Sequence, residues 1–196
     1  MLITNQIYKN TLVNYASKDS KLSNEVKKGH LIKIKNGLYE TDSNTPPHYL
    51  AGCIYGPSYI SFDFALAYYG LIPERVESIT CATFDKKKKK KYANSFGDFL
   101  YRDVPTKVYS YGIRLIEENG YSYQIAIPEK ALCDKLYTLS PVKNLNELQF
   151  LLFNDLRIDE EEFAKLNINT INEINLLYHS TNVDFLYRYM RRKNNE

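Results

Sequence analysis

The sequence has few of the residues that disulfide-stabilised and metal-binding proteins require. Among 196 residues there are three cysteines and three histidines, and they form no CxxC pair or histidine cluster. An odd, widely spaced set of cysteines indicates free thiols in a reducing compartment. We therefore expect a cytoplasmic protein without disulfides or a metal cofactor. The six residues are Cys53, Cys81, Cys133, His30, His48 and His179.

Sequence motifs of the common enzyme classes are also missing. There is no Gly-rich phosphate loop, no HExxH and no GxSxG. Five carboxylates could converge on a metal, but their spacing does not require it. We therefore expect no enzymatic activity, no catalytic residue and no cofactor. These carboxylates are Asp63, Asp98, Asp103, Glu129 and Asp134.

Long apolar runs and tryptophan are absent. No run of 18 apolar residues exists, and the N-terminus lacks the apolar core of a signal peptide, so neither a membrane span nor secretion is expected. Hydrophobic residues still make up 44% of the chain, which is enough to build a core. The 18 tyrosines carry most of the aromatic content, and a tyrosine buries its ring while its hydroxyl stays at a polar position.

Arginine is missing from the first 74 residues, although this region is basic. Residues 1–39 hold seven lysines against two acidic residues, a net charge of +5, whereas residues 145–196 hold six basic and nine acidic residues, a net charge of −3. Such an asymmetry is typical of a protein whose basic part meets nucleic acid. Lysine cannot form the bidentate fork of arginine with guanine, so phosphate contacts should dominate over base contacts.

Residues 31–40 predict a small β-hairpin. Ile32 and Ile34 alternate with Lys33 and Lys35, which is the period of a strand with one apolar face. Asn36-Gly37 is a strong hairpin signal, because a type I′ turn needs positive φ at both central residues.

Two helical patterns precede this hairpin, over residues 5–16 and 17–28. Two helices followed by a basic hairpin predict a winged helix-turn-helix that binds double-stranded DNA. In the second helix Leu22 and Val26 would face inward, and the other side chains would meet base edges or phosphates. The alternative is an ordinary solvated lysine-rich helix. The expected DNA-binding residues are Lys18, Ser20, Lys21, Ser23, Asn24, Lys27, Lys28, Lys33, Lys35 and Asn36.

Residues 41–48 are polar and rich in proline, and they predict a linker with a domain boundary at residues 45/46. The second domain, 46–196, should be a mixed α/β domain with a mainly antiparallel sheet and, from about Pro128, a cluster of short helices. Helices are expected from Pro46 or Pro47 and over 59–70, and strands over 76–84, 99–102, 108–116 and 121–127. The fold class is therefore α+β.

Six consecutive lysines follow Asp85: Lys86, Lys87, Lys88, Lys89, Lys90 and Lys91. Such a run repels itself and is commonly a solvated loop. The alternative is a surface for an anionic partner, either nucleic acid or an acidic protein.

Three motifs in order give the chain a family resemblance. They are Lys35-Asn36-Gly37-Leu38-Tyr39, then Pro57-Ser58-Tyr59-Ile60-Ser61 with Ala65-Leu66 and Gly70-Leu71-Ile72, then Ile127-Pro128-Glu129-Lys130-Ala131-Leu132-Cys133-Asp134. Together they resemble the AbiEi-type antitoxins of bacterial abortive-infection systems, over about residues 30–140. Where Asn36 stands, that family often has arginine.

The resemblance implies an autorepressor that binds inverted repeats in its own promoter through the winged helix. Inverted repeats are compatible with a monomer in solution of which two copies bind the DNA. It also implies a type IV antitoxin for phage defence, whose C-terminal domain counteracts a co-encoded nucleotidyltransferase toxin without an obligatory stable complex. Lys86–Lys91 and Arg102 are the candidate antitoxin surface, because such a toxin acts on anionic substrates. An RNA-binding regulator, or an enzyme that uses the C-terminal domain, remains the alternative.

Overall fold

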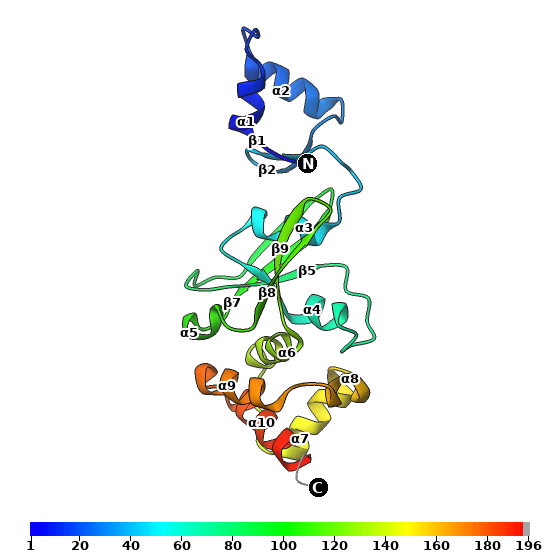
Figure 1. Ribbon diagram of the computed structural model, residues 1–196, viewed down its shortest axis with the longest axis vertical. Coiled ribbons are helices and arrows are strands. Elements are labelled where there is room, and N and C mark those ends of the chain that lie inside the picture. The colour runs from blue at the N-terminus through cyan, green and yellow to red at the C-terminus, as the bar shows by residue number, and fades with distance from the viewer. Residues whose placement is uncertain (194–196) are drawn as a thin grey trace.

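The computed structural model describes residues 1–193 and has an α+β fold. The molecule is elongated: a small head lies at one end, a β-sheet in the middle, and a cluster of helices at the other end (Figure 1). We call residues 1–40 the head and residues 47–193 the body. Among the described residues, no helix is both long and apolar enough to cross a membrane.

The head combines two helices with a three-stranded antiparallel sheet of order β1-β3-β2. Leu22, Leu31 and Tyr39 form its small core, against which Tyr8 and Val26 pack, so the inward orientation of Leu22 and Val26 is confirmed. The elements are β1 (Leu2–Thr4), α1 (Asn5–Thr11), α2 (Lys18–Lys27), β2 (Ile32–Lys35) and β3 (Leu38–Glu40).

Two local predictions for the head need correction. The first helix was predicted over residues 5–16, but α1 ends at Thr11. The hairpin itself is confirmed, but its turn is not type I′, because Gly37 has a φ of 78° whereas Asn36 is not in the left-handed region. A register shift between Lys33 and Lys35 accommodates this turn as a bulge.

The body is built on a six-stranded mixed sheet of order β6-β7-β5-β4-β9-β8. Three of the strand pairs are antiparallel, and β4·β9 and β5·β7 are parallel. Two-residue β4 joins the two halves of the sheet, because Ile60 pairs with both Cys81 and Ile125. The strands are β4 (Tyr59–Ile60), β5 (Ile79–Thr83), β6 (Lys90–Asn94), β7 (Gly97–Asp103), β8 (Ile113–Glu118) and β9 (Tyr121–Ala126).

Helices cover the sheet and continue into the C-terminal cluster, with α6 between the two (Figure 1). They are α3 (Pro47–Ile54), α4 (Phe62–Tyr68), α5 (Thr106–Tyr109), α6 (Pro128–Tyr137), α7 (Leu145–Phe150), the π-helical turn η1 (Leu151–Asp155), α8 (Glu160–Ala164), α9 (Ile168–Tyr178) and α10 (Thr181–Lys193).

Turn and capping signals explain most of these bounds. Asn119 and Gly120 both have positive φ between β8 and β9, as an Asn-Gly hairpin turn requires. The Asn144 and Asp159 side chains accept hydrogen bonds from N–H groups at the starts of α7 and α8, and each has a glutamate three residues later. Thr170 and Glu173 have the same spacing, but the cap of α9 is Asn167 and not Thr170.

Two body segments differ from prediction. The helix predicted over residues 59–70 begins only at Phe62, because Tyr59 and Ile60 form the central strand β4. The strand predicted over residues 108–116 starts as the short helix α5, and only from Ile113 does it continue as β8. Pairing with β5 and β9 overrides the local helical pattern at β4.

The β2–β3 hairpin belongs to two cores at once. Ile34 and Leu38 pack into the large body core, whereas Leu31 and Tyr39 pack into the small head core. All four side chains are buried. The head is therefore held against the body through its sheet, and α1 and α2 lie on the far side (Figure 1).

A fully buried polar cluster joins β4, α6 and α9. The Lys130 ammonium forms an ion pair with Asp134 one turn later, and it donates to the Tyr59 hydroxyl at 2.5 Å and to the Tyr178 hydroxyl at 3.1 Å. Asp134 also accepts from Ser61 at 2.5 Å, from Tyr59 at 3.0 Å and from Tyr178. Burial raises the pKa of both tyrosines well above the usual value.

Removing one partner of this pair leaves an unpaired buried charge. We expect Asp134→Ala to lower the free energy of unfolding by about 3–5 kcal/mol, measured by urea denaturation. The double variant Lys130→Met/Asp134→Leu should lose less, because it buries no charge. A loss below about 1 kcal/mol for Asp134→Ala would contradict a structural role for the pair.

Candidate nucleic-acid interface

Helix α2 belongs to the head, at the end of the molecule opposite the C-terminal helices (Figure 1). Ser20, Ser23, Asn24 and Lys27 recur at helical spacing, and all four are exposed. Leu22 on the opposite face is buried in the head core. The structure thus brings these four predicted residues together on one outward-facing surface, which we call the α2 face.

Lys21 was predicted on the same surface, but it has partners within the head. Its ammonium lies 2.8 Å from the Glu25 carboxylate and 5.5 Å from the centroid of the Tyr15 ring. Hydrogen bonds from Lys21 and then His30 lower the pKa of Glu25 from 4.5 to about 2. The charge of Lys21 is therefore largely compensated, unlike that of Lys27.

The other predicted lysines also fall into two groups, those without and those with a partner inside the protein. Lys27, Lys28 and Lys33 are exposed, Lys18 is half-buried, and none forms an ion pair with a described residue. Lys35 instead donates to the backbone carbonyls of Cys53 and Ile54, both at 2.7 Å. Its ammonium thus satisfies carbonyls at the C-terminus of α3, where a positive charge is favourable, so Lys35 has partners within the protein. Asn36 is exposed in the turn.

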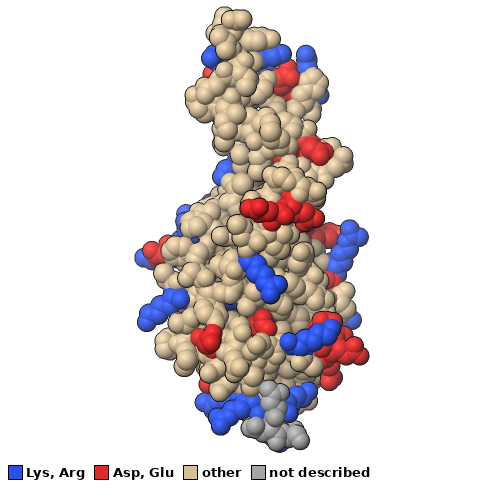
Figure 2. All heavy atoms as spheres, viewed as in Figure 1, with Lys and Arg blue, Asp and Glu red and all other residues tan. Residues whose placement is uncertain are grey.

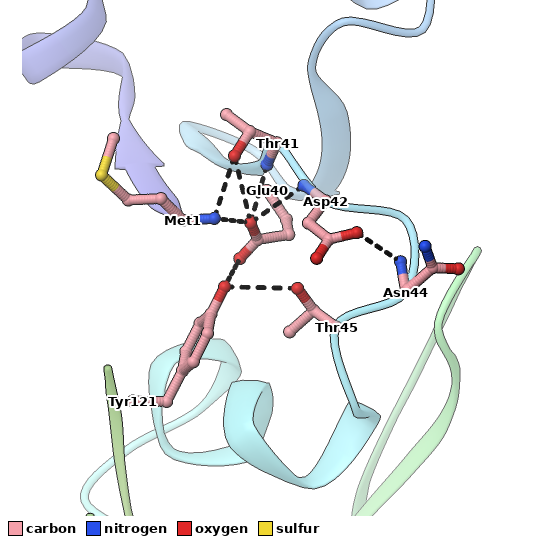
Figure 3. Close-up of polar contacts among 7 residues, drawn as sticks. All are labelled: Met1, Glu40, Thr41, Asp42, Asn44, Thr45 and Tyr121. Carbon is pink, nitrogen blue, oxygen red and sulfur yellow. Dashed lines mark hydrogen bonds and ion pairs between the residues drawn. The ribbon is translucent and has the colours of Figure 1, made fainter. Parts of the chain in front are cut away.

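A second set of polar contacts joins the end of β3 to the body (Figure 3). Glu40 at the end of β3 is completely buried, and its carboxylate accepts from the Tyr121 hydroxyl of β9 at 3.0 Å. Burial alone would raise the pKa of Glu40, but the Met1 amino group and the N–H groups of Asp42 and Thr41 outweigh it and lower the pKa. The Tyr121 hydroxyl also lies 3.2 Å from that of Thr45.

A further hydrogen bond ties the hairpin to the sheet of the body. The Asn94 side chain, at the turn between β6 and β7, donates to the Ile34 carbonyl at 3.2 Å. Together with Lys35 and Glu40, it connects β2 and β3 to three separate parts of the body. The head therefore has a defined position, and the α2 face a defined direction.

The lysine run is not a uniform loop. Lys86–Lys89 connect β5 to β6, and Lys90 and Lys91 belong to the edge strand β6. Lys87, Lys88, Lys89 and Arg102 line one cleft, together with Asp103 and Thr138. Lys86, Lys90 and Lys91 do not line it. Of the predicted antitoxin surface, the structure thus brings four residues together and separates three.

Charge is not gathered in one patch on the face of the molecule seen in Figure 2. Basic side chains are prominent at both ends of this view, and acidic and basic ones alternate between them. At the lower end, basic residues occupy the last turn of α10, where they complement the helix dipole.

Sequence reasoning missed the buried cluster around Lys130. Its signal was present, because Lys130 and Asp134 are four residues apart on one helix. The carboxylates considered for a metal are dispersed: Asp63 pairs with Lys135 at 2.6 Å, and Asp98 pairs with Lys91 at 2.5 Å. Within residues 1–193, no three His, Cys, Asp or Glu side chains are placed to hold a metal ion.

No protein-family model matches this chain, and no curated protein matches it in sequence.

The ion pair of Glu25 makes the stability of the head depend on pH. Because its pKa is lowered from 4.5 to about 2, its contribution is present above about pH 4.5 and is lost as the pH falls through about 2. We expect the thermal midpoint of the wild type to fall more over this interval than that of Glu25→Gln. Equal losses in both proteins would contradict the role of this carboxylate.

The two lysines of strand β2 should differ in their effect on stability. Lys35→Ala removes two charge-assisted hydrogen bonds and should cost about 1–3 kcal/mol in urea denaturation. Lys33→Ala, which removes an exposed side chain from the same strand, should change stability by less than about 0.5 kcal/mol. Equal effects would show that the Lys35 contacts do not hold the hairpin.

Proposed function

We propose that the head is a winged helix-turn-helix that binds double-stranded DNA with α2 in the major groove. The observation that carries this proposal is the α2 face, which is exposed at the tip of the molecule while its opposite side packs into the head core. An α-helix fits the major groove, and side chains on its outer face reach base edges. Residues 1–45 are then the DNA-binding domain.

The chemistry of the exposed residues assigns their roles. Asn24 can contact adenine N6 and N7 with its side-chain amide, and Ser20 and Ser23 can contact several bases. Lys27, Lys28, Lys33 and Lys18 supply phosphate contacts, which position the protein and give a strong dependence on salt. Lys21 and Lys35 have intramolecular partners and are left out of this set.

The wing has a consistent position in this arrangement. β2 is an edge strand of the head sheet, and the exposed side chain of Lys33 projects from it. Asn36 lies at the hairpin turn that follows. An edge strand with a lysine is protected against aggregation, and the same lysine is available to a phosphate.

The biological role follows from the resemblance to AbiEi-type antitoxins. We infer that the protein represses its own operon through inverted repeats, and that the body, residues 46–196, counteracts a nucleotidyltransferase toxin without catalysis of its own. Within the body, Lys87, Lys88, Lys89 and Arg102 are the residues to which we assign this second role. Two copies on a palindromic site would raise specificity beyond what one lysine-rich head supplies.

Binding to labelled duplex from the protein's own upstream region tests the DNA-binding proposal. Affinity should fall by about a thousandfold between 50 and 200 mM salt if about six phosphates are contacted. The upstream duplex should be preferred over a scrambled one by about a thousandfold or more. Preference for structured RNA would instead support an RNA-binding regulator, and absence of duplex binding would overturn the proposal.

A matched pair of variants locates the interface. Asn24→Ala/Lys27→Ala should weaken specific binding by about 2–4 kcal/mol and reduce the salt slope by about one. The control Lys143→Ala/Asn146→Ala removes the same residue types from exposed positions in and before α7 and should leave binding unchanged. Equal losses in the two variants would place the interface elsewhere.

Repression and neutralisation should be separable in cells. Asn24→Ala/Lys27→Ala, expressed to wild-type level from a foreign promoter, should fail to repress a reporter under its own promoter and still rescue growth from the co-encoded toxin. Loss of both activities at equal protein level would contradict the division of roles between head and body.

A further inference from the structure

A basic cleft lies between the β5–β6 connection and strand β7. Its volume is about 420 Å³, which falls within the range of about 300–1,000 Å³ typical of small-molecule sites. The lining residues are Lys87, Lys88, Lys89, Arg102, Asp103 and Thr138. Four of these six carry a positive charge, so the cleft is suited to an anion.

The backbone of the lysine loop is held in place at this cleft. Asp103 accepts from the Thr83 hydroxyl with one carboxylate oxygen and from the Lys87 N–H with the other, both at 2.6 Å. Lys87 has a φ of 55°, a left-handed conformation that costs energy for a long side chain and needs such a restraint. The three lysines that follow one another along the cleft are therefore presented by a fixed turn.

The six consecutive lysines fall into two groups of three. Lys86 lies 5.4 Å from the Tyr55 ring centroid, Lys90 lies 6.0 Å from that of Tyr92, and Lys91 pairs with Asp98 at 2.5 Å. Each of these has a partner within the protein and lies outside the cleft.

The basic residues that line the cleft have few partners within the protein. Lys88, Lys89 and Arg102 form no ion pair with any residue in the described part of the chain, whereas the Lys87 ammonium pairs with the exposed Asp85 at 3.9 Å. Asp103, the one acidic residue of the lining, keeps its negative charge while it accepts hydrogen bonds on both oxygens. The lining therefore carries four positive charges against one negative charge, a net charge of +3.

The lining also indicates which part of a ligand is recognised. Among the described residues, no aromatic ring lines the cleft, so nothing in it can stack on a base. The Thr138 hydroxyl donates to the Lys135 carbonyl at 2.8 Å. Lysine ammonium groups bind phosphate as point charges, and an arginine fork binds two of its oxygens.

We propose that this cleft is a binding site for a polyphosphate chain, such as that of a nucleoside triphosphate, and that it recognises the phosphates and not the base. The proposal deepens the antitoxin part of the proposed function and rests on it for its biological role. Nucleotidyltransferases consume nucleoside triphosphates. A polyphosphate site on the body would therefore bind the same class of ligand that the toxin uses as substrate.

Isothermal titration calorimetry of the full-length protein with inorganic triphosphate tests the site, without toxin or DNA. Lys87→Gln/Lys88→Gln/Lys89→Gln should weaken binding by about a hundredfold or more, because it removes three charge-assisted contacts and each one alone is worth about tenfold. The control Lys86→Gln/Lys90→Gln/Lys91→Gln removes the same formal charge from the same run and should weaken binding by less than about threefold. Arg102→Gln alone should weaken binding as a single contact does, by about tenfold.

ATP, GTP and sulfate serve as comparison ligands. ATP, GTP and inorganic triphosphate should bind within about threefold of one another, and sulfate should bind much more weakly. Equal losses in the two triple variants, or no binding by the wild type, would overturn the site. A strong preference for one base would overturn recognition through phosphates alone. If the cleft triple variant does not fold, Lys88→Gln and Arg102→Gln provide the same comparison as single changes.

The test is independent of the DNA-binding proposal. Failure to bind triphosphate would leave duplex binding by the head untouched, and failure to bind duplex would leave the cleft untouched.

Discussion

The hairpin of β2 and β3 is the element on which the rest of the structure depends, because it is buried on both sides. Ile34 and Leu38 belong to the body core, and Leu31 and Tyr39 belong to the head core. A head of about 40 residues buries too little apolar surface to be stable alone, and a shared hairpin lets it use the larger core. Lys35, Glu40 and Asn94 then satisfy polar groups around the contact.

This sharing has a consequence for recognition. A head on a flexible linker would sample many orientations, whereas a head packed on the body presents α2 in one direction (Figure 1). For the proposed DNA binding, preorganisation of this kind would reduce the entropy lost on binding and would fix how two copies approach neighbouring half-sites. It also places the basic cleft of the body and the α2 face on one rigid molecule. Mutations can therefore change the two proposed activities separately. The packing of the head on the body does not allow one to move freely past the other.

Much of the fold was predictable from local signals. Asn119-Gly120 marked its hairpin, Pro128 marked the start of α6, and the Leu22–Val26 spacing marked the inner face of α2. What failed depended on partners far away in the sequence. Tyr59 and Ile60 have a helical context but form a strand, because β5 and β9 pair with them. Lys33 and Lys35 look equivalent as alternate residues of a strand, and only the position of α3 shows that Lys35 binds carbonyls. The pairing of Lys130 with Tyr59 and Tyr178 likewise needs three elements that meet only in the fold.

The most direct test of the account is amide hydrogen exchange of the full-length protein with and without duplex from its own upstream region. If the head binds duplex through α2, added protection is concentrated in α2 and at the β2–β3 turn, with no change in residues 87–89 of the cleft. Protection confined to the lysine run of the body, with α2 unchanged, would contradict it, because the duplex would then bind the body and the head would serve only as structure.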